Sequence, residues 1–233
     1  MVEISTRYLS WDSDFFSKKI FRMDIRKNQN VDLINEVFNS LDCDLLYIFS
    51  EFDLKLKLNA TCFLADKKIL FSKRIDKNLT LLQKTEIKSV SKSSKKIDEL
   101  AILSGVYSRF KLDPFLSNKF EQLYKLWLDK SISKEIASEV FVYFYNDIEI
   151  GLITVKKTED NATVGLLAVD PQYASKKIGT SLMHSVESWC VNNGVDEIHV
   201  ATQLDNLKAC NFYRKNGFIT KQIDYIYHYH SEK

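Results

Sequence analysis

VATQLDNLKACNFYRKNGF, residues 200–218, is the stretch that decides the fold. It begins as an apolar strand and continues into a helix for which Asp205 can serve as the N-cap. The helix is expected to stop at Gly217, because glycine is the residue that most often ends helices. From Phe218 to Tyr229 apolar and polar residues alternate, as in a strand with one buried face. Strand, helix and strand in this order indicate an α/β domain.

A second informative stretch, VDPQYASKKIGTSLM at residues 169–183, precedes the first. It places a strand end, a loop and a helix N-terminus in immediate succession. Free backbone N–H groups and the helix dipole converge there, which makes an anion site suited to a pyrophosphate. The strand before it, Thr163 to Val169, is too continuously apolar to have one face in water. We therefore expect this strand in the middle of the sheet.

Residues 97–155, which precede this core, add helices and a hairpin. A helix is predicted over Ile97 to Gly105, a loop over Ser108 to Pro114, and an amphipathic helix over Phe120 to Leu128, where apolar residues recur at i, i+3, i+4, i+7 and i+8. Two alternating segments, Glu139 to Tyr145 and Ile148 to Val155, flank Asn146-Asp147 and predict an antiparallel hairpin.

The N-terminal part has its own pattern. Apolar residues at helical spacing from Leu33 to Leu41 and a buried run at Leu45 to Phe49 predict a small α/β unit, with further strands at Ile69 to Phe71 and Leu79 to Leu82. The segment Glu86 to Lys96 is polar, basic and serine-rich, and we interpret it as a linker. The predicted domains are therefore residues 1–92 and 93–233.

Composition excludes several classes of protein. The chain has 233 residues, of which 45% are hydrophobic, and a net charge of +2, far from the basic surplus of a nucleic-acid binder. The four cysteines have no zinc-ligand spacing, and we expect them to be reduced core residues: Cys43, Cys62, Cys190 and Cys210. The N-terminus has no apolar signal region, and no stretch approaches the ~20 apolar residues that cross a bilayer. We therefore predict a cytoplasmic protein without nucleic-acid or membrane partners.

The two central stretches resemble the donor-binding motifs of the GNAT superfamily of acyl-CoA-dependent N-acyltransferases. The usual first motif is an aliphatic strand, V-x-P, and Arg/Gln-x-x-Gly-x-Gly/Ala opening a helix; the closing motif is N-x-x-A-x-x-x-Y-x-x-x-G-F. The chain departs from the first motif at Ala174, Ser175 and Lys177, where the family usually has Arg or Gln and frequent glycines. The resemblance implies a mixed, mostly antiparallel central sheet flanked by helices, preceded by a smaller α/β N-terminal domain.

The same resemblance implies acetyl-CoA or another short-chain acyl-CoA as co-substrate and gives a donor site. Its residues are Leu167, Ala168, Val169, Ser175, Lys176, Lys177, Ile178, Gly179, Thr180, Asn206 and Ala209. In the family, backbone N–H groups at the strand end polarise the acyl carbonyl, the Asn contacts the pantetheine arm and the Tyr faces the thioester sulfur. We predict Tyr213 as general acid, because a phenol titrating near ~10 can donate to a thiolate whose thiol titrates near ~8.5.

No side chain identifies itself as the general base. His199 lies on a central strand and is predicted to be a packed histidine, so that a solvent chain can serve instead. His228 and His230 share one strand face, but two histidines without a third ligand do not make a metal site, and we expect no metal.

Segments outside the donor site resemble one subfamily, the dTDP-fucosamine N-acetyltransferases and related nucleotide-sugar enzymes. They are WDSDFF at residues 11–16, SRF at 108–110, GLLA at 165–168, VATQxxN at 200–206 and the tyrosine-rich last strand. The resemblance implies a dTDP-linked amino sugar as acceptor. We expect Arg109 and Lys111 to bind its diphosphate and an aromatic ring to stack on its base or sugar. The expected acceptor residues are Phe15, Phe16, Arg109, Phe110, Lys111 and Gln203.

Two alternatives stay open. The acceptor can be a peptide N-terminus, a lysine or a small polyamine. Alternatively, the chain can be a degenerate member that binds acyl-CoA or a protein partner without catalysis, as the departures in the phosphate loop suggest. A homodimer is the expected assembly because it is the commonest one.

Overall fold

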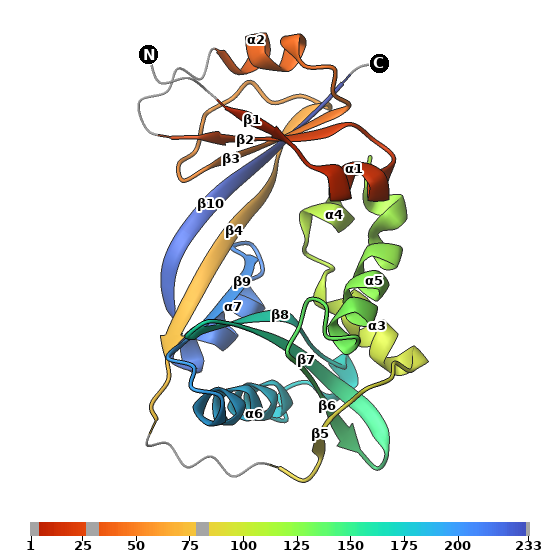
Figure 1. Cartoon of the computed structure of the whole chain (residues 1–233), viewed down its shortest axis with the longest axis vertical. Coiled ribbons are helices and arrows are strands. Elements are labelled where there is room, and N and C mark those ends of the chain that lie inside the picture. The colour runs from red at the N-terminus through yellow and green to blue at the C-terminus, as the bar shows by residue number, and fades with distance from the viewer. Residues whose placement is uncertain (1–4, 27–32, 78–83, 232–233) are drawn as a thin grey trace. The chain divides into compact units, whose positions relative to one another are not determined.

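The computed structural model describes residues 5–26, 33–77 and 84–231. The chain divides into two compact units. Unit 1 consists of Met1–Ile69, Gln203–Asp205 and Gln222–Lys233, and unit 2 of Leu70–Thr202 and Asn206–Lys221. Two long strands, β4 (Cys62–Arg74) and β10 (Ile219–His230), contribute residues to both units. Figure 1 labels the elements along the chain.

Unit 1 is a small α/β unit, as its sequence predicts. Its elements are β1 (Thr6–Tyr8), α1 (Ser10–Phe16), β2 (Ile20–Ile25), α2 (Leu33–Ser40) and β3 (Leu45–Ser50), together with parts of β4 and β10. The strand order is β1-β2-β3-β10. Strands β2 and β3 are parallel, because the connection through α2 lets the chain cross over, whereas β1 and β10 run antiparallel to their neighbours.

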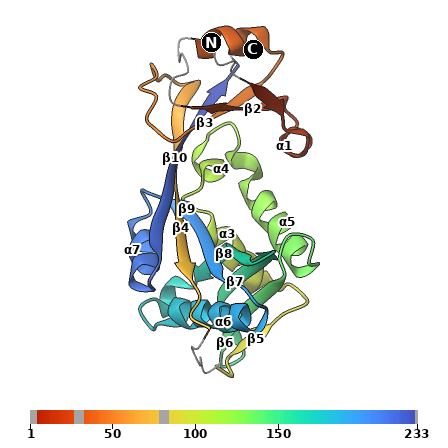
Figure 2. The same cartoon turned by 60° about the vertical axis from the view of Figure 1, so that its left-hand side comes forward.

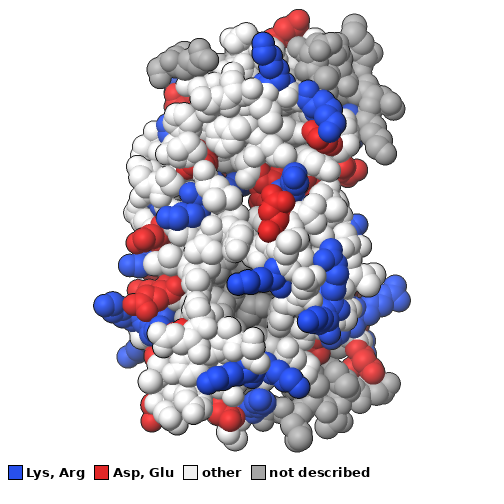
Figure 3. Space-filling model, turned by 180° about the vertical axis from the view of Figure 1, so that it is seen from behind, with Lys and Arg blue, Asp and Glu red and all other residues white. Residues whose placement is uncertain are grey.

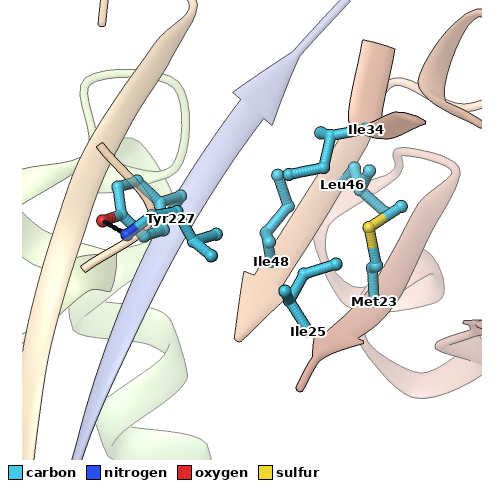
Figure 4. Packing of buried hydrophobic residues seen from close by; sticks show 7 residues of the cluster. Met23, Ile25, Ile34, Leu46, Ile48 and Tyr227 are labelled. Atoms are coloured by element: carbon cyan, nitrogen blue, oxygen red, sulfur yellow. Dashed lines mark hydrogen bonds between the residues drawn. The ribbon is translucent and has the colours of Figure 1, made fainter. Parts of the chain in front are cut away.

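The core of unit 1 forms where α2 covers these strands. Figure 4 shows its buried side chains, with Met23 and Ile25 from β2, Ile34 from α2, and Leu46 and Ile48 from β3. Each such side chain contributes about 1.5–3 kcal/mol by leaving water. Tyr227 from β10 joins the cluster. Its hydroxyl accepts a hydrogen bond from the Leu54 backbone N–H at 3.0 Å and donates one to Asp53 Oδ1 at 2.7 Å.

Unit 2 carries the sheet order β4-β9-β8-β7-β6-β5. Its remaining elements follow the chain as β5 (Ile87–Ser89), α3 (Lys95–Ser104), α4 (Arg109–Leu112), η1 (Ser117–Lys119), α5 (Phe120–Ile132), β6 (Glu139–Tyr145), β7 (Ile148–Thr158), β8 (Asn161–Val169), η2 (Pro171–Tyr173), α6 (Ile178–Asn192), β9 (Glu197–Gln203) and α7 (Leu207–Lys215). Strands β5 to β8 are antiparallel, and β8 and β9 are parallel. The expected mixed, mostly antiparallel sheet is therefore confirmed, with β8 in its interior.

Helices cover both faces of this sheet. Helix α6 lies on one side of β6–β8, while α3 and α5 lie on the other (Figures 1 and 2). Gly151 allows the close approach of α6, because a Cβ at this position would lie 2.9 Å from Leu182 Cδ1 and 3.0 Å from Ile178 Cγ2. The predicted hairpin turn is present, with positive φ at both Asn146 and Asp147.

The structure differs from the sequence-based expectation in several places. The segment Glu86 to Lys96 contains β5 and the start of α3, and the two compact units part inside β4, between Ile69 and Leu70. An edge strand and a capped helix start resemble a linker in composition because both expose polar side chains. The expected loop at 108–114 contains the helical turn α4, and Leu79 to Leu82 lies outside the described residues.

The four cysteines are free and buried, as expected. In the described part of the chain, no helix has the length and apolar character to span a bilayer.

Candidate functional site

Strands β8 and β9 pair over only part of their length. The parallel register joins Asn161–Val164 to Glu197–Val200, whereas β8 continues to Val169 and β9 to Gln203. Beyond Val164 the edge of β8 that faces β9 therefore has no ladder partner from β9 among the described pairs. Backbone N–H and C=O groups on an unpaired edge are available to bind an extended ligand.

A β-bulge lies where the two strands separate. On the other edge of β8 the register runs from Ile153↔Leu167 to Val155↔Val164, so β8 has one extra residue at Gly165–Leu166. The Leu166 N–H donates to Thr154 Oγ1 at 2.9 Å. A Cβ at Gly165 would lie 2.9 Å from the same oxygen, so glycine leaves room for the hydroxyl.

The direction of the β8 amides follows from this contact. The N–H groups of Leu166 and Asp170 point toward β7, since they donate to Thr154 Oγ1 and to the Ile150 carbonyl. Successive N–H groups of a strand point to opposite edges. The N–H groups of Leu167 and Val169 therefore face the open edge, where they can polarise a carbonyl.

The loop after β8 takes the backbone conformation of a glycine-rich loop without its glycines. Ser175 has φ 64° and Lys177 φ 60°, both in the left-handed region. Each non-glycine residue in this region costs roughly 1–2 kcal/mol. Glycine at these two positions would adopt the same backbone conformation without this cost.

This loop delivers the N-terminus of α6. Lys177 is the N-cap and makes no side-chain capping bond, so the amides of the first turn keep their capacity for a ligand. The side chains of Ser175, Lys176 and Lys177 are exposed, whereas Ile178 is buried. The helix dipole and the two lysine charges act in the same direction and favour an anion.

Asp170 fixes the start of the loop. Its Oδ1 accepts a hydrogen bond from the Gln172 N–H at 2.9 Å, and its Oδ2 lies 2.7 Å from Lys96 Nζ. The hydrogen bond from Lys96 lowers the pKa of Asp170. Lys96 comes from the segment interpreted as a linker, and here it ties α3 to the loop.

Helix α7 brings the second motif to the same place. Asn206 is its N-cap, with Oδ1 accepting from the Ala209 N–H at 3.1 Å, and this corrects the expected cap at Asp205. The cap uses only Oδ1, so the Asn206 amide keeps its two N–H donors. A Cβ at Gly179 would lie 3.2 Å from the Phe212 ring, which means that α7 packs directly on the start of α6. The two motifs therefore form one site.

Tyr213 is buried in an aromatic environment, with 5% of its surface exposed. Its ring centroid lies 5.6 Å from that of Phe71, 5.3 Å from Phe212 and 5.7 Å from Phe218. Burial raises the pKa of the Tyr213 hydroxyl well above its ordinary value. Among the described residues, no hydrogen bond involves this hydroxyl. The Tyr213 hydroxyl is therefore protonated and can donate a hydrogen bond to a ligand.

A pocket of about 370 Å³ lies on the α5 face of the sheet, beside the bulge. Its lining comes from α5, the segment after α5, β7 and β8: Trp127, Ser131, Ile136, Ala137, Thr154, Lys156, Thr163, Gly165 and Leu166. The walls are mostly apolar. Lys156 is the only charged residue in this lining, and the lining contains no carboxylate. Because Gly165 and Leu166 also form the bulge, the pocket adjoins the open edge of β8.

The expected acceptor residues fall into two groups. In unit 2 the Arg109 guanidinium lies 4.3 Å from the Phe110 ring centroid, and Phe110 meets Trp127, a pocket residue, edge-to-face at 5.7 Å. Lys111 Nζ lies 5.2 Å from the Phe120 ring. Phe110 therefore contacts a residue of the pocket and Arg109 lies over Phe110, whereas Lys111 lies over Phe120, which is outside the pocket lining.

The other expected acceptor residues belong to unit 1. Phe15 stacks on Trp11 at 5.3 Å, and Gln203 Nε2 lies 3.5 Å from Asp66 Oδ2. Phe16 is only 5% exposed and packs as a core residue in this structure, because α1 turns it inward.

Sequence patterns alone missed Thr154 and Lys156, which line the pocket. Gly165 inside an apolar strand was the available signal, since an isolated glycine in a strand often marks a bulge. The face drawn in Figure 3 exposes both basic and acidic side chains, with the basic ones more frequent in the lower half of the view.

Comparisons with known proteins place this site in context. The profile of the "Acetyltransferase (GNAT) family" matches residues 105–218. Streptothricin acetyltransferase A of Bacillus subtilis is 29% identical over 125 residues, 53% of this chain and 72% of that protein. Spore coat polysaccharide biosynthesis protein SpsD of the same organism is 28% identical over 57% of this chain and 46% of its own length. Spermidine N(1)-acetyltransferase of Thermoplasma acidophilum is 27% identical over 52% and 75%.

Solved structures agree on the fold. A conserved protein of unknown function from Staphylococcus epidermidis has a TM-score of 0.64 at 13% identity and covers 99% of this chain and 93% of its own. A GCN5-related N-acetyltransferase from Sphaerobacter thermophilus has a TM-score of 0.57 at 9% identity, covering 96% and 75%.

Proposed function

Residues 105–218 belong to the acetyltransferase (GNAT) family, and from that premise we propose that the chain acylates the amine of a dTDP-linked amino-deoxy sugar. Family membership makes the chain an acyl-CoA-dependent N-acyltransferase. The acceptor, and the assembly as a homodimer, are the proposed parts. The observation that carries the acceptor proposal is the chemistry of the pocket beside the bulge.

The donor half of the proposed site follows the open edge of β8. The pantetheine arm takes the place that β9 leaves, and the pyrophosphate lies at the N-terminus of α6, where Lys176 and Lys177 add positive charge. The Asn206 amide adds two donors beside this path. These groups hold the thioester so that its carbonyl meets the N–H groups of Leu167 and Val169.

The reaction needs little further machinery from the protein. The amine attacks the acyl carbon, a C–N bond forms and the C–S bond breaks, while the β8 amides stabilise the negative charge on oxygen. Tyr213 keeps its proton at neutral pH because burial raises the pKa of its hydroxyl. It therefore acts by donating a hydrogen bond to the sulfur as thiolate character develops. Holding amine and thioester together supplies much of the rate.

The acceptor half favours a neutral or anionic molecule over a polycation. Desolvating a polyamine or a lysine side chain requires compensating carboxylates, and the described pocket lining has Lys156 but no acidic residue. Trp127 offers an apolar face to a sugar ring. Arg109, which lies over the Phe110 ring beside Trp127, and Lys111 on the same helical turn are the cations that we assign to the two phosphates of a nucleotide-linked sugar.

The relatives support two different acceptor classes. SpsD is described as a spore coat polysaccharide biosynthesis protein, which agrees with a sugar acceptor, whereas the other two relatives are described as acting on streptothricin and spermidine. A small-molecule amine is therefore the second candidate.

A thiol-release assay separates these acceptors. Purified protein is given acetyl-CoA and other short acyl-CoAs with dTDP-linked amino sugars, spermidine or a peptide with a free N-terminus. We expect turnover with the sugar nucleotide at a kcat/KM at least tenfold above that for spermidine. Protection against heat by dTDP, compared with the same concentration of phosphate, measures the nucleotide contribution separately. Equal protection by the two anions would refute the nucleotide-sugar acceptor.

A further inference from the structure

The proposed transfer lacks one element, a group that takes a proton from the acceptor. An aliphatic amine is largely protonated at neutral pH and cannot attack until a proton leaves. The described pocket lining has no Asp, Glu or His, and Tyr213 is a donor. A side-chain base would therefore have to come from a residue next to the lining, and otherwise a solvent chain serves.

The strand register places His199 in that position. Thr163 on β8 pairs with Lys156 on β7 and with His199 on β9, so the three residues form one cross-strand row. Paired residues of neighbouring strands point to the same face of a sheet. Lys156 and Thr163 both line the pocket, and the His199 side chain extends this row by one strand.

The imidazole of His199 is held at one nitrogen and free at the other. Its Nε2 lies 3.3 Å from Glu197 Oε2, two residues earlier on the same strand face. Its Nδ1 is buried and has no hydrogen-bond partner among the described residues. A buried unpaired acceptor costs about 1–3 kcal/mol, which a bound water or amine would recover.

Glu197 sets the tautomer. Burial raises the pKa of this carboxyl, but the hydrogen bond from Ser72 and the charges of His199 and Lys221 outweigh this, and the net shift is downward. Glu197 is therefore ionised at neutral pH and accepts the Nε2–H, which leaves the Nδ1 lone pair as the proton acceptor.

The other groups that face His199 leave this assignment intact. Lys156 on β7 and Thr163 on β8 share its cross-strand row, whereas Ser72 on β4 and Lys221 on β10 contact Glu197, with Lys221 Nζ 3.4 Å from Glu197 Oε2. Trp127 and Ser131 on the opposite wall of the pocket do not titrate in this range. The positive charges of both lysines disfavour a protonated imidazole. The Glu197 carboxylate is the nearby group that stabilises it.

We propose that His199 is the general base of the transfer, with Glu197 as its positioning residue; this rests on the proposed function. The acceptor ammonium gives one proton to His199 Nδ1, directly or through one water. The C–N bond then forms as the C–S bond breaks, the second proton of the nitrogen goes to the CoA sulfur, and His199 returns its proton to solvent.

The test is the pH dependence of kcat/KM for His199→Gln and Glu197→Gln, with His184→Gln as control because His184 is an exposed histidine on α6. The wild type should lose activity on the acid side of its pH profile, because a protonated imidazole cannot accept a proton. His199→Gln should lose roughly 10²–10⁴-fold in kcat and this acid limb, while the acceptor's own ionisation stays in the profile. Glu197→Gln should move the limb to lower pH, because a protonated imidazole loses its anion. Acetyl-CoA affinity by calorimetry should not change in any variant.

A structural role predicts a different result. If His199→Gln lowers the rate but keeps the acid limb, or keeps the rate, His199 is not the base. Should the Gln variant fold poorly, His199→Ala with added imidazole takes its place, and absence of rescue overturns the proposal. Lack of wild-type turnover with every acceptor would instead refute the proposed function itself.

Discussion

Ser175→Gly should stabilise the protein, although most substitutions to glycine destabilise. Ser175 has φ 64°, in a region that costs a non-glycine residue roughly 1–2 kcal/mol relative to glycine. Glycine also makes the unfolded chain more flexible, which costs about 0.4–1 kcal/mol. The difference is a net gain of up to ~1.5 kcal/mol.

The neighbouring residue supplies a matched control. Ala174 has φ −57° and ψ 156°, a backbone conformation that alanine adopts without strain. Ala174→Gly therefore gains nothing in the folded state and should lose about 0.4–1 kcal/mol through the unfolded state. Two adjacent glycine substitutions in one loop should thus have opposite signs.

Urea unfolding followed by circular dichroism measures both variants against the wild type at constant m-value. A gain of 1 kcal/mol corresponds to about 2–4 °C in Tm for a chain of this size. If Ser175→Gly destabilises as much as Ala174→Gly, the loop does not hold the left-handed conformation, and the argument that it keeps the shape of a glycine-rich loop fails.

Other variants probe the rest of the site. Tyr213→Phe should lower kcat roughly 10²-fold or more and leave acetyl-CoA binding by calorimetry unchanged, because it removes only the hydrogen bond to the departing sulfur. Lys96→Met should make the stability of the protein less dependent on pH in acid. Asp170 has a lowered pKa in the folded state because of Lys96, so it stabilises the folded protein fully above the unfolded pKa of about 3.9. This stabilisation is lost as pH falls through the folded pKa. Lys156→Glu should lower kcat/KM for a sugar nucleotide and raise it for spermidine, each by tenfold or more, since it reverses the one charge of the pocket lining. The fragment 93–233 should not fold cooperatively in thermal unfolding, because it lacks the part of β4 that belongs to unit 2.

Local patterns predicted the elements that a short stretch of sequence determines. The hairpin around Asn146-Asp147 was predictable because two alternating strands flank a dipeptide that tolerates positive φ, and both residues have it. The capping residue of α7 was harder, since Asp205 and Asn206 are adjacent and both are good caps. Only the structure identifies Asn206 as the cap, because its Oδ1 accepts the hydrogen bond from the Ala209 N–H.

The errors occurred where distant segments meet. Strand β4 spans Cys62–Arg74, but only Ile69 to Phe71 was predicted, because its burial changes along its length and leaves no simple alternation. Likewise Ser94 looks like linker composition until its Oγ is seen to accept the Ile97 N–H at 3.2 Å. Composition cannot distinguish an exposed edge from a flexible connection.

The donor half and the acceptor half of the site differ in how the sequence encodes them. The strand end, loop and helix start that we propose for the donor are contiguous, and Asn206 and Tyr213 lie on one helix start and its second turn, which is why short motifs suggest them. The proposed acceptor pocket takes residues from α5, β7 and β8, and the proposed base comes from β9, so the composition of this pocket depends on register and on one bulge. Relatives described as acting on streptothricin and on spermidine align with only about half of this chain. A shared donor motif therefore carries little information about the acceptor, and our proposal for the acceptor rests instead on Lys156, Trp127 and the absence of a carboxylate from the described pocket lining.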